Sequence, residues 1–97
     1  MAQEHNLGQA IKTVRAARGL SQEAFSDVSS RTYLSTLERG LKSPTLNKLA
    51  ELCEVMQIHP LTLLTLAYAH EGVHTEQLLA QICEEVHDIL PSEKPVK

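Results

Sequence analysis

Four polar side chains share one side of a predicted short helix: Arg31, Thr32, Ser35 and Thr36. An arginine there can donate two hydrogen bonds to a guanine, and threonine methyl groups can contact the methyl group of thymine. Leu34 and Leu37 lie on the other side of the same predicted helix, where they would anchor it to a core. The pattern therefore predicts a helix that is held by its apolar side and reads bases in the major groove of DNA.

Residues around this helix have the chemistry to hold DNA phosphates. Gln22 stands at the start of the preceding predicted helix, and the N-terminal end of a helix attracts anions. Ser30 precedes the base-reading helix, and Arg39 and Lys42 follow it. Hydroxyl groups and basic side chains at such places fix the register of a protein on DNA.

A second pattern with chemical meaning is the run His70-Glu71-Gly72-Val73-His74, which spells the HExxH signature of zinc proteases. That chemistry needs both histidines on one face of a helix. Gly72 falls in the middle, and Thr75 is a good cap for a new helix, so we expect a hinge with solvated histidines. The alternatives are a zinc protease, or a structural or sensory metal site that uses both histidines of the motif, with or without His87.

The two cysteines, Cys53 and Cys83, match no metal-binding spacing. A redox switch between them is one alternative. Free cysteine usually acts as a small buried apolar residue, and that is the role we expect for both. The sequence shows no nucleophile–base pair, glycine-rich phosphate loop or paired carboxylates. We therefore expect no enzymatic activity, no metal and no cofactor.

Helical spacing, caps and breakers predict six helices and no strands, which makes the fold class all-α. The helices start near Asn6, Ser21, Arg31, Ser43-Pro44, His59-Pro60 and Thr75. Gly19 and Gly40 end the first and third helices, and Pro91 ends the last. The predicted inner face of the fourth helix is Leu46, Leu49, Ala50, Cys53 and Met56.

Composition and charge fit one helical domain of 97 residues, of which 42% are hydrophobic and 3% aromatic. Residues 1–45 carry six Lys and Arg against four Asp and Glu, whereas residues 46–97 carry three against eight. This asymmetry suits one end that faces DNA and another turned away from it. No apolar run is long enough to span a membrane, and the first six residues lack the parts of a signal peptide. We expect a cytoplasmic protein with reduced cysteines.

From Leu7 to about Leu66 the chain resembles the Cro/repressor-type helix-turn-helix family, also called the xenobiotic-response-element family. The matching residues are Ile11, Arg15, Gly19-Leu20-Ser21-Gln22-Glu23, Phe25, Tyr33-Leu34-Ser35, Leu37-Glu38-Arg39-Gly40, Ser43-Pro44-Thr45-Leu46, Leu49-Ala50 and Leu63-Leu64. The resemblance implies a lambda-repressor-like five-helix domain that acts as a dimer on operators with two-fold symmetry. It implies base contacts from Gln22, Arg31, Thr32 and Thr36, and phosphate contacts from Ser30, Tyr33 and Arg39. It also implies an internal ion pair between Arg15 and Glu38.

The sequence departs from the family between Phe25 and Arg31, where it is about two residues shorter than usual and lacks the usual turn glycine. Either the second helix ends early at Ser26, or Asp27 tightens the turn by adopting a left-handed conformation. In both cases we expect a short second helix and a compact turn.

The last predicted helix forms an apolar stripe beyond what the family pattern covers. We expect residues 1–69 to form the DNA-binding domain, and residues 70–97 to supply a C-terminal helix and tail for dimerisation. The expected homodimer interface is Leu61, Leu64, Tyr68, Leu78, Leu79, Ile82 and Val86. The sequence thus predicts a dimeric, sequence-specific transcriptional repressor that reads a palindromic operator. The alternative is an antitoxin or adaptor that uses the same fold to bind a protein partner.

Overall fold

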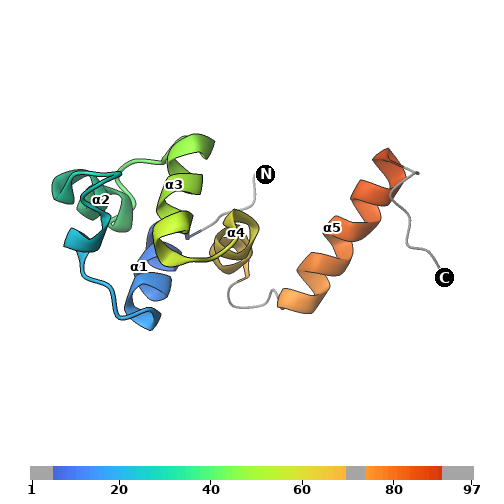
Figure 1. Cartoon of the computed structure of the whole chain (residues 1–97). Coiled ribbons are helices and arrows are strands. Elements are labelled where there is room, and N and C mark those ends of the chain that lie inside the picture. Colours follow the sequence, from blue (N-terminus) through green and yellow to red (C-terminus); the bar gives the residue numbers. More distant parts are fainter. Residues whose placement is uncertain (1–5, 70–73, 91–97) are drawn as a thin grey trace.

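The computed structural model describes residues 6–69 and 74–90. Along this part of the chain run α1 (Leu7–Ala17), the 3-10 helix η1 (Gln22–Phe25), α2 (Arg31–Glu38), α3 (Leu46–Met56), α4 (Pro60–Tyr68) and α5 (Thr75–Ile89). No strand occurs in the described residues. The fold is therefore all-α, as predicted, with five helices followed by the additional helix α5 (Figure 1).

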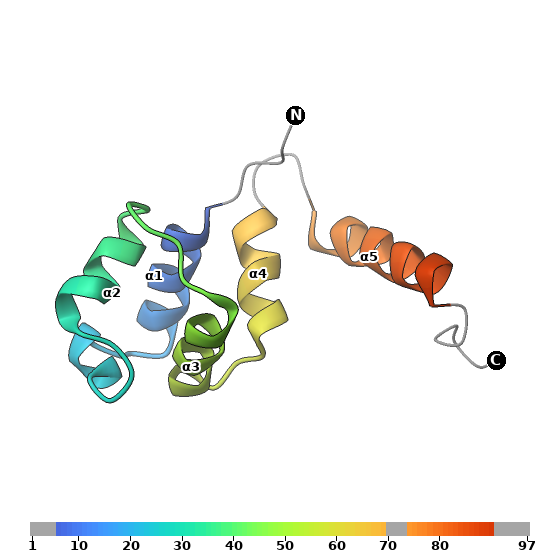
Figure 2. The same cartoon turned by 90° about the horizontal axis from the view of Figure 1, so that it is seen from above.

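The core is formed entirely by residues of the elements from α1 through α4, η1 included. Its twelve buried apolar side chains are Ala10, Ile11, Val14, Phe25, Leu34, Leu37, Leu49, Leu52, Cys53, Met56, Leu63 and Ala67. By contrast, α5 has no buried residue. Figures 1 and 2 both show α5 extending away from the rest of the molecule beside α4, with α2 at the opposite end. None of the described helices is long and apolar enough to cross a membrane.

The predicted helix ends are formed by local backbone chemistry. Asn6 caps α1, since its side-chain oxygen accepts from the Gln9 amide at 3.2 Å. Gly19 and Gly40 adopt φ values of 68° and 76° just after α1 and α2, where a side chain would be strained. Gln57 takes the same left-handed conformation at the end of α3, with φ of 59°, without being a glycine.

The prediction for the start of α3 was wrong. The helix begins at Leu46 rather than at Ser43-Pro44, and the Thr45 hydroxyl caps it by accepting from the Lys48 amide at 3.1 Å. Because the first turn lies at the rim of the core, Leu46 is 78% exposed. The stripe that faces the core consists of Leu49, Leu52, Cys53 and Met56, with Leu52 in place of the expected Ala50.

The connection into α2 is short, as predicted. The helix η1 is a single 3-10 turn that ends at Phe25, with Ser26 as its C-cap residue. The amides of Val28 and Ser29 both donate to the Phe25 carbonyl, at 2.9 and 2.8 Å. Among the described non-glycine residues only Gln57 has a positive φ, so Asp27 does not adopt the left-handed conformation. The early end of the second helix, and not a left-handed residue in the turn, accounts for the short spacing between Phe25 and Arg31.

Gly8 sets the approach of α1 to α2. A Cβ atom at this position would lie 2.6 Å from the Leu37 carbonyl oxygen and 2.7 Å from that of Glu38. Backbone atoms cannot move aside as a flexible side chain can. The absent side chain at Gly8 therefore lets the C-terminal end of α2 pack directly on α1, which fixes the angle of α2.

Candidate nucleic-acid interface

Helix α2 is held by one face and open on the other. Leu34 is 0% and Leu37 1% exposed. On the opposite side Arg31 and Thr32 are exposed, and Ser35 and Thr36 are half-buried. The Ser30 hydroxyl accepts from the Tyr33 amide at 3.0 Å and so fixes the start of the helix. The structure thus gives α2 the two faces that the sequence predicted.

A buried carboxylate joins α1, η1 and α2. The Arg15 guanidinium donates from Nε to Glu38 Oε2 at 2.6 Å and from Nη2 to Oε1 at 3.1 Å. Its Nη1 donates to the Leu20 carbonyl at 3.0 Å, and Gln22 Nε2 donates to Glu38 Oε1 at 3.1 Å. The side chains of Arg15 and Glu38 are 16% and 5% exposed. This arrangement confirms the predicted ion pair.

The hydrogen bonding of Arg15 to the Glu38 carboxylate, which accepts, raises the pKa of Arg15 against the opposing effect of burial. The charge of Arg15 is therefore permanent at any pH at which the protein would bind DNA. Three donors converge on one carboxylate, and charge-assisted bonds of this kind are stronger than neutral ones. The network holds the single turn η1 in a fixed place relative to α2.

Glu38 also determines how Gln22 presents its amide. A carboxylate only accepts hydrogen bonds, so the Gln22 amide nitrogen must face Glu38. The side-chain oxygen and the second N–H hydrogen of Gln22 are then left for a ligand. One acceptor beside one donor matches the edge of adenine in the major groove. The sequence pointed to Gln22 but contained no signal for this orientation.

The hydroxyl groups near α2 are already partly engaged. Thr36 Oγ1 donates to the Thr32 carbonyl at 2.8 Å, which leaves its oxygen only as an acceptor and its methyl group for apolar contact. Ser30 uses its oxygen as the cap acceptor and keeps its hydroxyl hydrogen for donation. A free donor at Ser30 suits a phosphate oxygen, whereas the methyl group of Thr36 suits thymine.

Arg31 is accessible and only weakly restrained. Its Nη1 lies 3.8 Å from Glu23 Oε1, and the two side chains are 73% and 77% exposed. Exposed pairs of this kind contribute little, so the guanidinium can leave Glu23 for a stronger partner. Arg31 and Glu23, with Arg15, Ser21 and Gln22, line a depression of about 260 Å³ between η1 and the start of α2. Two of the candidate reading groups, Gln22 and Arg31, therefore lie at one place.

Arg39 and Lys42 are exposed directly after α2, and Tyr33 is half-buried against the core.

Two further basic residues, Lys48 and Arg18, had no role predicted from the sequence, and both stabilise the fold. Lys48 donates to the Val28 carbonyl and pairs with Glu51 at 3.0 Å, so that α3 supports the turn before α2. Arg18 donates to the carbonyls of Met56 and Gln57 at the end of α3, at 2.9 and 3.3 Å.

The structure describes only part of the residues on which the competing chemistries depend. Residues 70–73 of the HExxH run lie outside the described residues, and His74 precedes α5 as its cap residue. Along residues 6–69 and 74–90 no three histidine, cysteine or acidic side chains gather where they could hold a metal ion.

Cys53 is 1% exposed, and burial raises the pKa of its thiol, which matches its predicted apolar role. Cys83 is exposed, so the expectation of burial was wrong for it.

The residues predicted for dimerisation fall into two groups. Leu64, Tyr68 and Leu78 are half-buried where α4 meets α5. The other four remain exposed: Leu61 by 62%, Leu79 by 44%, Ile82 by 43% and Val86 by 40%. Leu61, Leu79 and Ile82 line the cleft between α4 and α5 together with the first group, whereas Val86 lies outside the cleft lining.

An anchored helix with an outward polar face, preceded by a short helix that it holds through a buried carboxylate, defines a helix-turn-helix DNA-binding protein. The family model described as helix-turn-helix matches residues 11–63, more than half of the chain. The chain belongs to the Cro/repressor-type helix-turn-helix family of DNA-binding regulators. No curated protein and no solved structure was found to match it.

Proposed function

We propose that the protein is a dimeric, sequence-specific transcriptional repressor that inserts α2 of each copy into the major groove of a palindromic operator. The observation that carries this proposal is the double attachment of α2. Leu34 and Leu37 anchor it to the core, and Glu38 ties it to Arg15 and Gln22. A rigid helix with a polar outer face can present donors and acceptors to base edges at fixed positions.

The side chains divide by the partner that their chemistry suits. Bases would be read by Gln22, Arg31, Thr32, Ser35 and Thr36, of which Arg31 suits guanine and Gln22 adenine. Phosphates would be held by Ser30, Tyr33, Arg39 and Lys42. The accessibility of Arg31, Arg39 and Lys42 supports these assignments.

Charge and architecture support a division of labour along the chain. We propose that residues 1–69 bind DNA and that residues 70–97 serve dimerisation, in the cytoplasm. The interface would involve Leu61, Leu64, Tyr68, Leu78, Leu79, Ile82 and Val86. A two-fold dimer would place its two α2 helices about 34 Å apart, one turn of DNA. Occupying an operator in this way would repress by blocking access to the DNA.

Selection of bound sequences from random double-stranded DNA tests this function. We expect enrichment of a palindrome with half-sites about 10 base pairs apart, and binding that weakens steeply as salt is raised. A variant that carries Arg31→Ala and Thr32→Ala is the matched control, because it keeps the core and removes reading groups. If the wild-type protein enriches no motif at low salt, the proposed function is wrong.

The second candidate is an interaction module, such as an antitoxin or adaptor, that grips a protein through α4 and α5. The exposed apolar side chains of α5 favour it, since an isolated domain of this size rarely leaves so many uncovered. DNA reading and partner binding can coexist in one chain. A pure adaptor would show no sequence preference in the selection experiment.

A further inference from the structure

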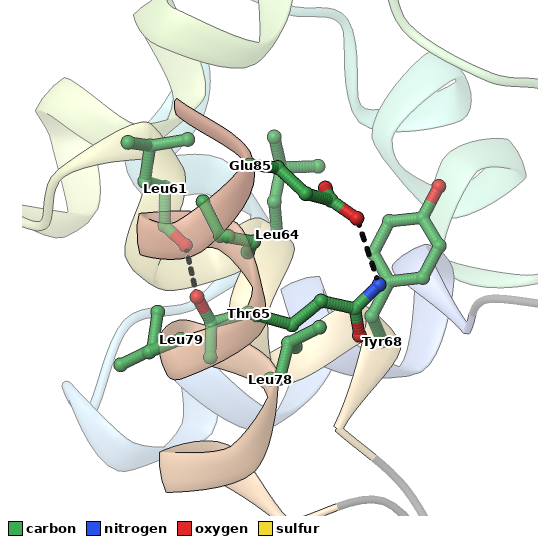
Figure 3. A pocket seen from close by; sticks show the side chains of 9 residues that line it. Leu61, Leu64, Thr65, Tyr68, Leu78, Leu79 and Glu85 are labelled. Carbon is green, nitrogen blue, oxygen red and sulfur yellow. Dashed lines mark hydrogen bonds between the residues drawn. The ribbon is translucent and has the colours of Figure 1, made fainter. Parts of the chain in front are cut away.

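The helices α4 and α5 enclose a cleft of about 550 Å³ within one chain. Its apolar lining residues are Leu61, Leu64, Leu78, Leu79 and Ile82. Figure 3 shows leucines of both helices pointing into the same space. Pockets that hold small molecules have volumes of about 300–1,000 Å³ and mostly apolar walls with a few placed polar groups. The cleft therefore has the size and the lining of a ligand site.

The polar side chains of the cleft are Thr65, Gln81 and Glu85. Thr65 Oγ1 donates to the Leu61 carbonyl at 2.7 Å, which leaves its oxygen only as an acceptor. Gln81 Nε2 donates to Glu85 Oε2 at 3.0 Å, so the amide nitrogen is turned toward the carboxylate (Figure 3). The carboxylate itself can only accept. A ligand would thus meet mainly acceptors, one of which is negatively charged.

No lysine or arginine lies in α4 or α5 to balance this charge. The sequence contains neither residue type between Lys48 and Lys94. The acidic residues of α5 are Glu76, Glu84, Glu85 and Asp88. The same two helices of a second copy would bring further carboxylates, and like charges at close range repel. Charge complementarity therefore favours a cation that comes from outside the chain.

The volume of the cleft limits the size of its occupant. An α-helix is about 10 Å across and rises about 1.5 Å per residue. About five residues of helix would fill 550 Å³, whereas α5 alone has 15 residues. A partner helix laid along α5 could not enter the cleft, but a small molecule could.

We propose that the cleft between α4 and α5 binds a small apolar amine, which carries its positive charge beside an aromatic or aliphatic body. The ammonium group would donate to Glu85, and charge-assisted hydrogen bonds of this kind are stronger than neutral ones. The body would lie against Leu64, Leu79 and Ile82, where burial of apolar surface adds to the affinity. The site goes beyond the proposed function, because it requires neither DNA nor a second copy.

The cleft overlaps the interface proposed for the dimer. All the residues of that interface except Val86 line the cleft. A bound amine would compete with a second copy for them and so oppose dimerisation. This consequence rests on the proposed function, whereas the binding of the amine does not.

Three fluorescent compounds that share one ring test the class of ligand. Naphthylmethylamine is a cation at neutral pH, naphthylmethanol is neutral and naphthylacetate is an anion. The chain has no tryptophan, so no indole emission overlaps that of the naphthalene ring. We expect the full chain to bind the amine about fivefold more tightly than the alcohol, and the acetate least, because Glu85 is exposed and exposed ion pairs contribute modestly. Equal affinities for the amine and the alcohol, or no saturable binding of the amine, would overturn the proposal.

Two pairs of variants locate the binding site. Glu85→Gln should reduce the affinity for the amine to that for the alcohol, whereas Glu84→Gln removes the same charge outside the cleft lining and should have no effect. Ile82→Ala should weaken the amine and the alcohol alike by about fivefold, but Val86→Ala, outside the lining, should not. All four variants keep the core, since α5 has no buried residue. Equal effects of both members of a pair would place the binding elsewhere and overturn the proposal.

Hydrogen exchange tests whether the ligand contacts both helices. The amides of α5 should exchange rapidly in the free protein, because no residue of α5 is buried. Saturating naphthylmethylamine should slow their exchange and leave that of α2 unchanged. Binding without protection of α5 would contradict a site between α4 and α5. None of these experiments contains DNA, so failure of the DNA selection would refute the proposed function while leaving the ligand site standing.

Discussion

Replacement of Glu38 by alanine should destabilise the protein far more than replacement of an ordinary surface acid. The change removes the acceptor for two bonds from Arg15 and one from Gln22. Loss of one partner of a buried pair costs about 3–5 kcal/mol when the remaining charge is fully enclosed. Arg15 is 16% exposed and keeps its bond to the Leu20 carbonyl, which lowers the expected loss to about 2–3 kcal/mol.

Urea unfolding measures this loss through the shift of the transition midpoint. The matched control is Glu23→Ala, whose pair with Arg31 is exposed and should contribute less than about 0.5 kcal/mol. The double variant with Arg15→Ala should recover part of the loss, since it removes the uncompensated charge. If Glu38→Ala behaves like Glu23→Ala, the buried network does not hold η1 to α2, and our reasoning about the position of Gln22 fails with it.

Three further predictions concern the backbone and the DNA contacts. Gly8→Ala should lower the unfolding free energy by about 1–3 kcal/mol, because the new Cβ would meet the backbone carbonyls at the end of α2. Gln9→Ala is the control and should change the unfolding free energy little. Equal stabilities of the two variants would show that α1 can shift without loss. Gln57→Gly should raise the unfolding free energy by about 0.5–1 kcal/mol, measured by urea, by relieving a left-handed conformation; a decrease would contradict this. Lys42→Ala should weaken binding to all DNA sequences alike and reduce the slope of log affinity against log salt by about 1; a change in sequence preference would assign Lys42 to a base instead.

The sequence predicted those parts of the fold that depend on local chemistry. Gly19 and Gly40 were expected to end helices and do so with positive φ values. The polar and apolar sides of α2 follow from spacing alone, since Leu34 and Leu37 can only be buried together on one face. The ion pair of Arg15 and Glu38 followed from the family resemblance.

Contacts between distant segments could not be predicted in the same way. The start of α3 was misplaced because Ser43-Pro44 and Thr45 are both good start signals, and only the position of the core selects Thr45. Gly8 carries no local signal, because its role comes from the carbonyls of residues 37 and 38. The orientation of Gln22 likewise depends on Glu38, sixteen residues away in the sequence. The sequence marked Gln22 as a candidate without showing which atoms it can offer.

The central claim, that the outer face of α2 reads bases, is tested most directly by pairing one protein change with single base changes. The affinities of the wild-type protein and of Arg31→Ala would be measured for the selected operator and for each of its single-base variants at one salt concentration. We predict that the wild type loses about 1–3 kcal/mol when one guanine of each half-site is replaced, and that Arg31→Ala no longer distinguishes the bases at that position. A loss for Arg31→Ala that is uniform over all variants would contradict the claim, because it would show Arg31 to be a phosphate contact.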